Sequence, residues 1–393
     1  MNARTFLPLL SLSALASLGV PACAADDKEP TEEQFAEDRC NDENVVCEAY
    51  GRATGYQNKP EAYELGDGVR TPTMKVVYTG QTGFQPVDLE FNPRAPKEMW
   101  IVNYGTSHAT IVRNPGLATQ EVIERRDPAF SHYMYKPVGI AMGGTSTQWG
   151  QLWATCGDND NGGDDHMGPT MYSADLRLFG YQNPNTGLGT HLDMLHSTSF
   201  CRGIAWGGTK NTYWVFNSDQ GAIDFYDFKT DHGPGNTDHS DGVIRRFANR
   251  QVKGVNNVMS HLSWDAATKK LYVADTGNKR IISLDPANAR MVAPLPGNEF
   301  IAGRDFYEGT LKTVVPSSAG LVQPSGLEAT GGLAFVTDAS TSKIHAFKLS
   351  DGSLVRSFST GLPTGSLAGL NFGPDGKIYF VDRKGNRVYR IDP

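Results

Sequence analysis

Histidine and aspartate side chains gather in a few segments of the chain, and these residue types can bind a divalent metal or transfer protons. The segment Gly157–Gly168 reads GDNDNGGDDHMG and carries Asp158, Asp160, Asp164 and His166. Alternating carboxylates, with a glycine where the backbone must bend, give hard oxygen ligands at the spacing of a calcium loop. The segment lacks the downstream bidentate carboxylate of an EF-hand, so a solvated acidic loop is the alternative. His166 beside these carboxylates could equally recruit a transition metal.

His261 is the clearest single candidate. It lies in a strand pattern that recurs along the chain, and no other copy of the pattern has a histidine at the matching position. The other copies carry Asp88 or a glycine there. We expect the position to line a central channel, where an imidazole suits a divalent metal or acid–base chemistry and Asp88 could add a carboxylate. Arg202, one residue before the position in the third copy, is a candidate anion contact. The alternatives are a hydrogen bond from His261 to a neighbouring turn and a structural tie between loops for Arg202.

The elements that must position these residues are six copies of a β-meander. The first strands of the copies read PVDLEF, PVGIAM, CRGIAW, HLSW, PSGLEA and LAGLNF, and a second apolar strand follows each of them. The copies recur at intervals of roughly 40 to 65 residues, which is typical of β-propeller blades. The sequence therefore predicts an all-β fold, a six-bladed β-propeller, that forms one domain over residues 73–393.

The last copy supplies only three of the four strands of a blade. It contributes LAGLNF, IYFVDRK and NRVYRID before the chain ends at Pro393. The segment Thr73–Thr79 (TMKVVYT) reads as a lone strand that has no partner before the first copy. We therefore predict that Thr73–Thr79 is the outer strand of the last blade and closes the ring.

Strand connectivity assigns the histidines to two faces of this ring. If every first strand runs downward, one face holds the loops that lead into each blade and the loops between second and third strands. We call it the ligand face, because propellers commonly bind ligands there, and we expect it to carry five histidines: His132, His166, His191, His196 and His261. His232 and His239 fall between a third and a fourth strand, which assigns them to the opposite face. The one-sided distribution predicts a site at the channel face, with His196 or His166 as further metal ligands.

Residues 1–22 have the features of a secretory signal, with one arginine and an apolar run before small residues. Cys23 follows Val20-Pro-Ala, which is similar to a lipobox, while ordinary signal-peptidase cleavage also fits. A lipid anchor at Cys23 on a bacterial envelope and free export to the periplasm or outside therefore both stay open. We expect residues 23–72 to be an acidic, irregular arm. The net charge of −7 argues against nucleic acid or an anionic membrane surface as a partner.

The remaining four cysteines favour disulfides, because exported proteins meet an oxidising compartment. Cys40 and Cys47 are close enough in sequence to pair locally. Cys156 ends the second strand of the second blade and Cys201 begins the first strand of the third, so these two could meet on one face.

The segments LYVADTGNKRIISLD and IYFVDRKGNRVYRID resemble the NHL repeat. This resemblance implies a six-bladed ring of the kind found in protein- and RNA-binding scaffolds. Related rings include gluconolactonase-like enzymes and the peptidyl-hydroxyglycine amidating lyase. His261 looks like a zinc-binding histidine of the lyase, but the other blades offer no matching histidines, so the zinc set is not carried over. Asp88 is the one residue of this chain that resembles a calcium ligand of the gluconolactonase-like enzymes.

Three functional hypotheses follow from these observations. The first is an exported, monomeric propeller that binds a small molecule, glycan or peptide at the channel face, with calcium or zinc as a divalent metal. The second is a metal-dependent lyase or lactone hydrolase, with His261 as ligand or base and Arg202 stabilising negative charge. The third is a structural or protein-interaction scaffold of the cell envelope.

Overall fold

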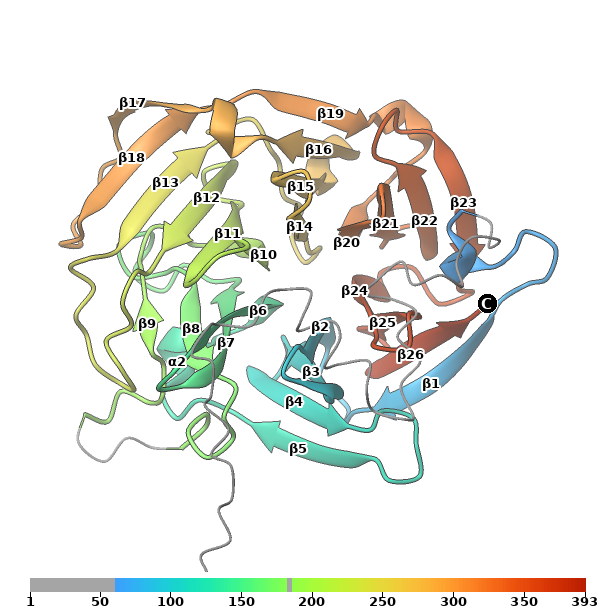
Figure 1. The fold of residues 1–393 in the computed structure, drawn as a ribbon, viewed down its shortest axis with the longest axis horizontal. Helices are drawn as coiled ribbons and strands as arrows, with labels where there is room; N and C mark the ends of the chain where they lie inside the picture. Colours follow the sequence, from blue (N-terminus) through green and yellow to red (C-terminus); the bar gives the residue numbers. More distant parts are fainter. Residues whose placement is uncertain (1–60, 182–185) are drawn as a thin grey trace, which may run out of the picture.

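Six β-sheets stand around a central axis, as Figure 1 shows. The computed structural model describes residues 61–181 and 186–393. The predicted signal segment and the predictions for Cys23, Cys40 and Cys47 lie outside these residues. The prediction of an all-β, six-bladed propeller is confirmed. No helix within the described ranges is long and apolar enough to span a membrane.

Each of the first five blades takes its four strands from one stretch of the chain, with an insertion between the third and fourth strands of blade four. Blade one contains β2 (Pro86–Asn92), β3 (Ala95–Asn103), β4 (His108–Arg113) and β5 (Glu121–Arg125). Blade two contains β6 (Pro137–Ser146), β7 (Gly150–Gly157), β8 (Thr170–Ser173) and β9 (Asp193–Met194). Blade three contains β10 (Cys201–Trp206), β11 (Thr212–Asn217), β12 (Ala222–Asp227) and β13 (Val243–Phe247). Blade four contains β14 (Leu262–Asp265), β15 (Lys270–Asp275), β16 (Arg280–Leu284) and β19 (Leu311–Val315), and blade five contains β20 (Pro324–Thr330), β21 (Leu333–Asp338), β22 (Lys343–Lys348) and β23 (Leu354–Ser359).

The two ends of the described chain meet in blade six. This blade contains β24 (Leu367–Phe372), β25 (Ile378–Asp382), β26 (Arg387–Asp392) and the N-terminal strand β1 (Thr73–Thr79). β1 runs antiparallel to β26, with Thr73 opposite Asp392 and Thr79 opposite Arg387. The predicted closure of the ring is confirmed, and Figure 1 shows β1 lying along the outer edge beside β26.

Aromatic side chains hold neighbouring blades face to face. Trp100 of blade one and Trp153 of blade two are fully buried, and their ring centroids lie 5.5 Å apart. Phe335 of blade five contacts Phe372 of blade six edge to face at 5.0 Å. Because every sheet packs between two others, the second strands are apolar on both faces, and the burial comes from long-range contacts between repeats.

The segment before β1 is docked on the ring from residue 61 onward. A short 3₁₀ turn, η2 (Tyr63–Leu65), places Ala62 and Leu65 in a buried cluster with residues of blades five and six. We had expected no structure before Thr73, and the finding corrects this for the end of the arm. The cause is local, since two apolar side chains are enough to fill a gap beside β22 and β23.

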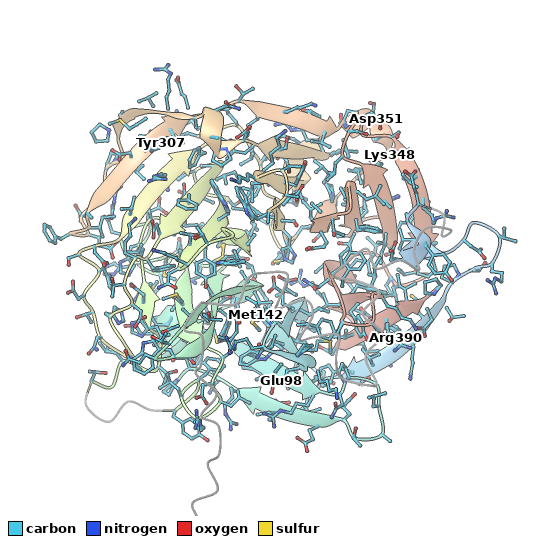
Figure 2. The ribbon with its side chains drawn as sticks, viewed as in Figure 1. Glu98, Met142, Tyr307, Lys348, Asp351 and Arg390 are labelled. Carbon is cyan, nitrogen blue, oxygen red and sulfur yellow. A yellow bond between two sulfur atoms is a disulfide. The ribbon has the colours of Figure 1, made fainter. Side chains whose placement is uncertain are left out.

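A hairpin inserted into blade four extends blade three, which the sequence did not lead us to expect. It consists of β17 (Arg290–Pro294) and β18 (Gly303–Glu308), and β18 pairs in parallel with β13. Tyr307, labelled in Figure 2 at the outer rim, lies 5.2 Å from the ring of Phe247. The hairpin therefore covers the edge of blade three and carries the turn that contains Glu299 towards blade two.

A disulfide joins Cys156 at the end of β7 to Cys201 at the start of β10. The prediction that these two cysteines meet is confirmed. The bond ties blade two to blade three near the centre of the ring, while the hairpin connects the same region at the rim.

Candidate metal centre

Four histidines meet between the outer edges of blades two and three. The ring centroids of His191 and His232 lie 5.0 Å apart, those of His232 and His239 lie 5.4 Å apart, and those of His239 and His196 lie 5.6 Å apart. The expectation that His232 and His239 lie on the opposite face from His191 and His196 is therefore wrong. We find one continuous cluster instead of two separate groups.

The cause of this convergence is the shortness of β9, which has only two residues. His191 precedes β9 and His196 follows it, so a longer strand would have carried them to opposite ends of the blade. The loop between β12 and β13 folds back onto this short edge, where the His232 amide donates to the Leu192 carbonyl at 3.1 Å. The loop thereby brings His232 and His239 of blade three against blade two.

Two further histidines border the cluster. His132, on the short helix α2 (Phe130–Tyr133), and His166 lie with ring centroids 6.0 Å and 6.3 Å from that of His196. Burial, and then the neighbouring histidines, together lower the pKa of His132 to about 4. We therefore expect His132 to be neutral at neutral pH and to form part of the wall of the cluster.

Asp193, His232 and His239 have the geometry of a metal-binding group. One donor atom from each of these side chains lies within 4.8 Å of the others. Both carboxylate oxygens of Asp193, and Nε2 of His232 and His239, are buried and have no well-formed hydrogen bond to any of the described residues. The Met194 amide favours the charged form of Asp193 but does not offset its burial. Burying polar groups without partners is costly, and a carboxylate is the costliest of these groups. A divalent cation among them would satisfy all of these atoms at once.

The other ring nitrogen of each histidine is held by an acceptor. Oε1 of Glu299 lies 2.7 Å from Nδ1 of His196 and 2.7 Å from Nδ1 of His239. Nδ1 of His232 lies 2.7 Å from the Gly233 carbonyl. Since these oxygens accept a hydrogen bond from Nδ1–H, they hold the proton on Nδ1 and leave Nε2 with its lone pair free, which is the tautomer that binds a metal through Nε2. Nε2 of His196 is also buried without a partner.

Glu299 is placed to act as the carboxylate that orients the ligands. Burial alone would raise the pKa of Glu299, but hydrogen bonds from His196 and His239 outweigh it and lower the pKa to about 2. Its second oxygen accepts from the His196 amide at 3.0 Å and lies 3.3 Å from Nη2 of Arg304. This carboxylate is therefore ionised and fixed from three sides. The side chains of His196, His239 and Glu299 also have donor atoms within 4.8 Å of one another, and the hydrogen bonds to Glu299 account for this closeness.

Asp193 and His232, in the candidate metal-binding group, are both buried where their charged forms are unfavourable. Burial raises the pKa of Asp193 well above its usual range, and nearby acidic groups raise it further. Burial also lowers the pKa of His232. Nε2 of His232 lies 4.0 Å from Oδ1 of Asp193, which is too far for a hydrogen bond that would compensate both groups.

His261 and Asp88 meet in the centre of the ring, away from this cluster. Nδ1 of His261 lies 3.5 Å from Oδ1 of Asp88, and Nε2 lies 3.0 Å from the Val138 carbonyl. Asp88 also accepts from the Ile140 amide at 3.0 Å, and burial raises its pKa. Both side chains are buried, so they fill the channel and bridge inner turns. The structure thus gives His261 the hydrogen bond to another blade that was the alternative to a metal-binding role.

A glycine opposite the pair explains why the repeat tolerates it. A Cβ atom at Gly369 would lie 2.0 Å from Oδ1 of Asp88. The glycine of blade six therefore makes room for the carboxylate of blade one at the same level of the channel. Asp88 can thus replace a small residue because the neighbouring blade has kept a glycine beside it.

The acidic loop of blade two directs its carboxylates to separate partners. Asp158 forms a buried ion pair with Arg202 and accepts a hydrogen bond from the Tyr104 hydroxyl at 3.0 Å. Asp164 accepts from the amide and the hydroxyl of Ser199 at 2.8 Å and 2.6 Å. Asp160 joins neither close group of metal-binding side chains found in the described residues. Calcium in this loop remains a prediction, and Arg202 takes the role of a tie between loops.

The comparisons with known proteins support the fold. No protein-family model matches the chain, and no curated protein matches it. An auxiliary nutrient binding protein from Bacteroides thetaiotaomicron is 14% identical, with 82% of this chain and 77% of that chain covered and a TM-score of 0.53. An auxiliary nutrient binding protein from Bacteroides ovatus is 11% identical, with 82% of this chain and 76% of that chain covered and a TM-score of 0.52. A luciferin-regenerating enzyme is 10% identical, with 82% of this chain and 95% of that chain covered and a TM-score of 0.50. At these identities the likeness extends to the six-bladed architecture alone.

Proposed function

We propose that this protein is an exported ligand-binding propeller whose blades two and three are joined at the rim by a buried divalent metal. The observation that carries this proposal is the set of buried atoms without partners on Asp193, His232 and His239. A side chain that is buried without a partner is uncommon in a native protein, and several of them facing one another point to a missing ligand.

Zinc is the metal that fits these donors best. Imidazole nitrogens suit zinc and related transition metals, whereas calcium takes six to eight oxygen ligands. Carboxylate oxygen and imidazole nitrogen are both zinc ligands, and His196, whose Nε2 is also buried, is a candidate for the fourth ligand. Glu299 accepts hydrogen bonds from the other ring nitrogen of two of these imidazoles, as a carboxylate commonly does beside zinc-bound histidines.

The metal would be structural and not catalytic. A catalytic zinc keeps one coordination position open to water or substrate. Here Nε2 of His232 and of His239 and both oxygens of Asp193 are shielded from solvent. The ligands come from the edge of blade two and from a loop of blade three, and Glu299 comes from the hairpin that starts in blade four. One ion would therefore add a further tie between blades two and three, beside the backbone hydrogen bond from His232 to Leu192 and the Cys156–Cys201 disulfide.

Export is supported by the Cys156–Cys201 disulfide, because such bonds persist in oxidising compartments. We retain a small molecule, glycan or peptide at the channel face as the ligand class. The lyase or lactone hydrolase hypothesis has less support, because both ring nitrogens of His261 face protein groups and the rim histidines lie elsewhere. An envelope scaffold and the NHL type of repeat stay as hypotheses.

Thermal unfolding in the presence and absence of zinc tests the proposal. Zinc added to chelator-treated protein at about a hundred times its Kd should stabilise the fold by about 2.7 kcal/mol, because it binds the folded state. The double variant His232→Ala/His239→Ala should show no such shift, whereas His345→Ala, on blade five, should respond like the wild type. Equal melting temperatures of the wild type with zinc and with chelator would refute the metal.

A further inference from the structure

A basic pocket lies between blades three and four, apart from the metal centre. It has a volume of about 570 Å³, which falls in the range of sites for small molecules. Its lining residues are Arg250, Gln251, Val252, Lys253, Asn278, Arg280 and Ser317. They belong to the loop that leads into blade four, to the turn between β15 and β16, and to the segment after β19. The neighbouring Gly254 adjoins Arg202, since a Cβ there would lie 3.4 Å from the Arg202 side chain.

The pocket presents two exposed cationic side chains. Arg250 and Lys253 are exposed, and no hydrogen bond or ion pair engages their charged groups within residues 61–181 and 186–393. Arg280 is paired with Asp275 at 2.7 Å and is only partly exposed. On a chain with a net charge of −7, a concave site with two uncompensated positive charges is an attractive place for an anion.

One buried carboxylate organises the lining of the pocket. Asp275 accepts hydrogen bonds from the Lys253 amide at 2.8 Å, from Nδ2 of Asn278 at 2.9 Å and from Nε of Arg280 at 2.7 Å. Nη2 of Arg280 in turn donates to the Gln251 carbonyl at 3.1 Å. The loop that carries the free cations is therefore held in place, and the positive charges are presented on a fixed frame.

Neutral polar groups accompany the cations. Nδ2 of Asn278 is used by Asp275, so its Oδ1 remains as an acceptor for a hydroxyl group. Gln251 adds an amide and Ser317 a hydroxyl, and buried Val252 gives a small apolar floor. Donors and acceptors of this kind beside two cations match a ligand that carries one acidic group and several hydroxyl groups.

We infer that this pocket binds a small hydroxylated anion with the chemistry of an acidic sugar. The inference rests on the proposed function as a binding protein, and it names the ligand class and the place of binding. It does not depend on the metal. The carboxylate of the sugar would lie between Arg250 and Lys253, and its hydroxyl groups would meet Asn278, Gln251 and Ser317.

Calorimetric titration of the full chain with sodium D-glucuronate, D-glucose and sodium sulfate tests this inference. We expect glucuronate to bind, with an affinity that falls as salt rises, and glucose and sulfate to bind at least tenfold more weakly. The double variant Arg250→Ala/Lys253→Ala should weaken glucuronate binding by tenfold or more. Lys269→Ala, an exposed lysine on another loop of blade four, should leave it unchanged.

Failure of this inference is distinguishable from failure of the metal centre. Absent glucuronate binding, or binding that the double variant leaves intact, would overturn the acidic-sugar site. Sulfate binding as tightly as glucuronate would overturn the role given to the hydroxyl groups. The Arg250→Ala/Lys253→Ala variant should keep the zinc-dependent melting shift, which confirms that it is folded and separates the two sites.

Discussion

Glu299 and His239 are joined by a hydrogen bond of 2.7 Å, although one residue lies on the hairpin inserted into blade four and the other on a loop of blade three. The same oxygen of Glu299 also holds His196 of blade two. A single carboxylate therefore aligns imidazoles from two blades. In the proposed metal centre, the inserted hairpin would therefore supply the carboxylate that orients two imidazoles.

Replacing Glu299 by Gln should weaken zinc binding without removing a ligand. Loss of an orienting carboxylate typically lowers metal affinity 10- to 100-fold, because the imidazoles lose their fixed tautomer and basicity. Competition with a zinc chelator would measure the change. Glu308→Gln, on the same hairpin but exposed and paired with Arg290, is the matched control and should bind zinc like the wild type. Equal affinities of the two variants would contradict the orienting role.

Closure of the ring by β1 can be tested with two adjacent valines. Val77 is 3% exposed and packs in the main core, whereas Val76 is 42% exposed. Val77→Ala should lower the free energy of unfolding by about 2 kcal/mol, since it removes most of a buried apolar side chain. Val76→Ala should change it by less than about 0.5 kcal/mol. Chemical denaturation measures both, and comparable losses would argue that β1 does not seal the ring.

The stability of the channel should depend on pH through Glu328. Burial, and then the nearby Asp88, raise the pKa of Glu328 to about 8, from an ordinary value of 4.5 in the unfolded chain. The folded state therefore holds a proton that the unfolded state releases between these values. This contribution to stability is complete below about pH 4.5 and is lost as the pH rises through 8.

Glu328→Gln isolates this effect. At pH 9 the variant should be more stable than the wild type by on the order of 2 kcal/mol, and at pH 4 the two should unfold alike. Thermal unfolding at the two pH values provides the measurement. If the difference in stability between the variant and the wild type were the same at both pH values, Glu328 would have an ordinary pKa in the folded protein.

Much of the fold could be predicted because its signals are local or repeated. The six first strands share a pattern, and the missing fourth strand of the last blade required Thr73–Thr79 to fill it. Cys156 and Cys201 fell at strand ends that the connectivity already placed together. None of these inferences needed the length of a loop or the path of an insertion.

The metal centre could not be predicted, because its geometry depends on two irregular features. β9 is too short to separate His191 from His196, and the β17–β18 hairpin crosses to blade three. The long interval between the fourth and fifth copies was a signal of an insertion, but its direction is set by tertiary pairing with β13. His261 is the opposite case, because both its departure from the repeat and its nearness to Asp88 follow from the pattern, while the Val138 carbonyl that occupies its other nitrogen does not.

The metal content of the purified protein tests the central claim most directly. Elemental analysis of the full chain after exhaustive dialysis should find about one zinc per chain in the wild type and in His345→Ala. It should find less than about a tenth of that in Asp193→Asn/His239→Gln, a variant whose side chains keep nearly the original volume. Absence of stoichiometric metal from the wild type, or full zinc occupancy in the double variant, would contradict the account.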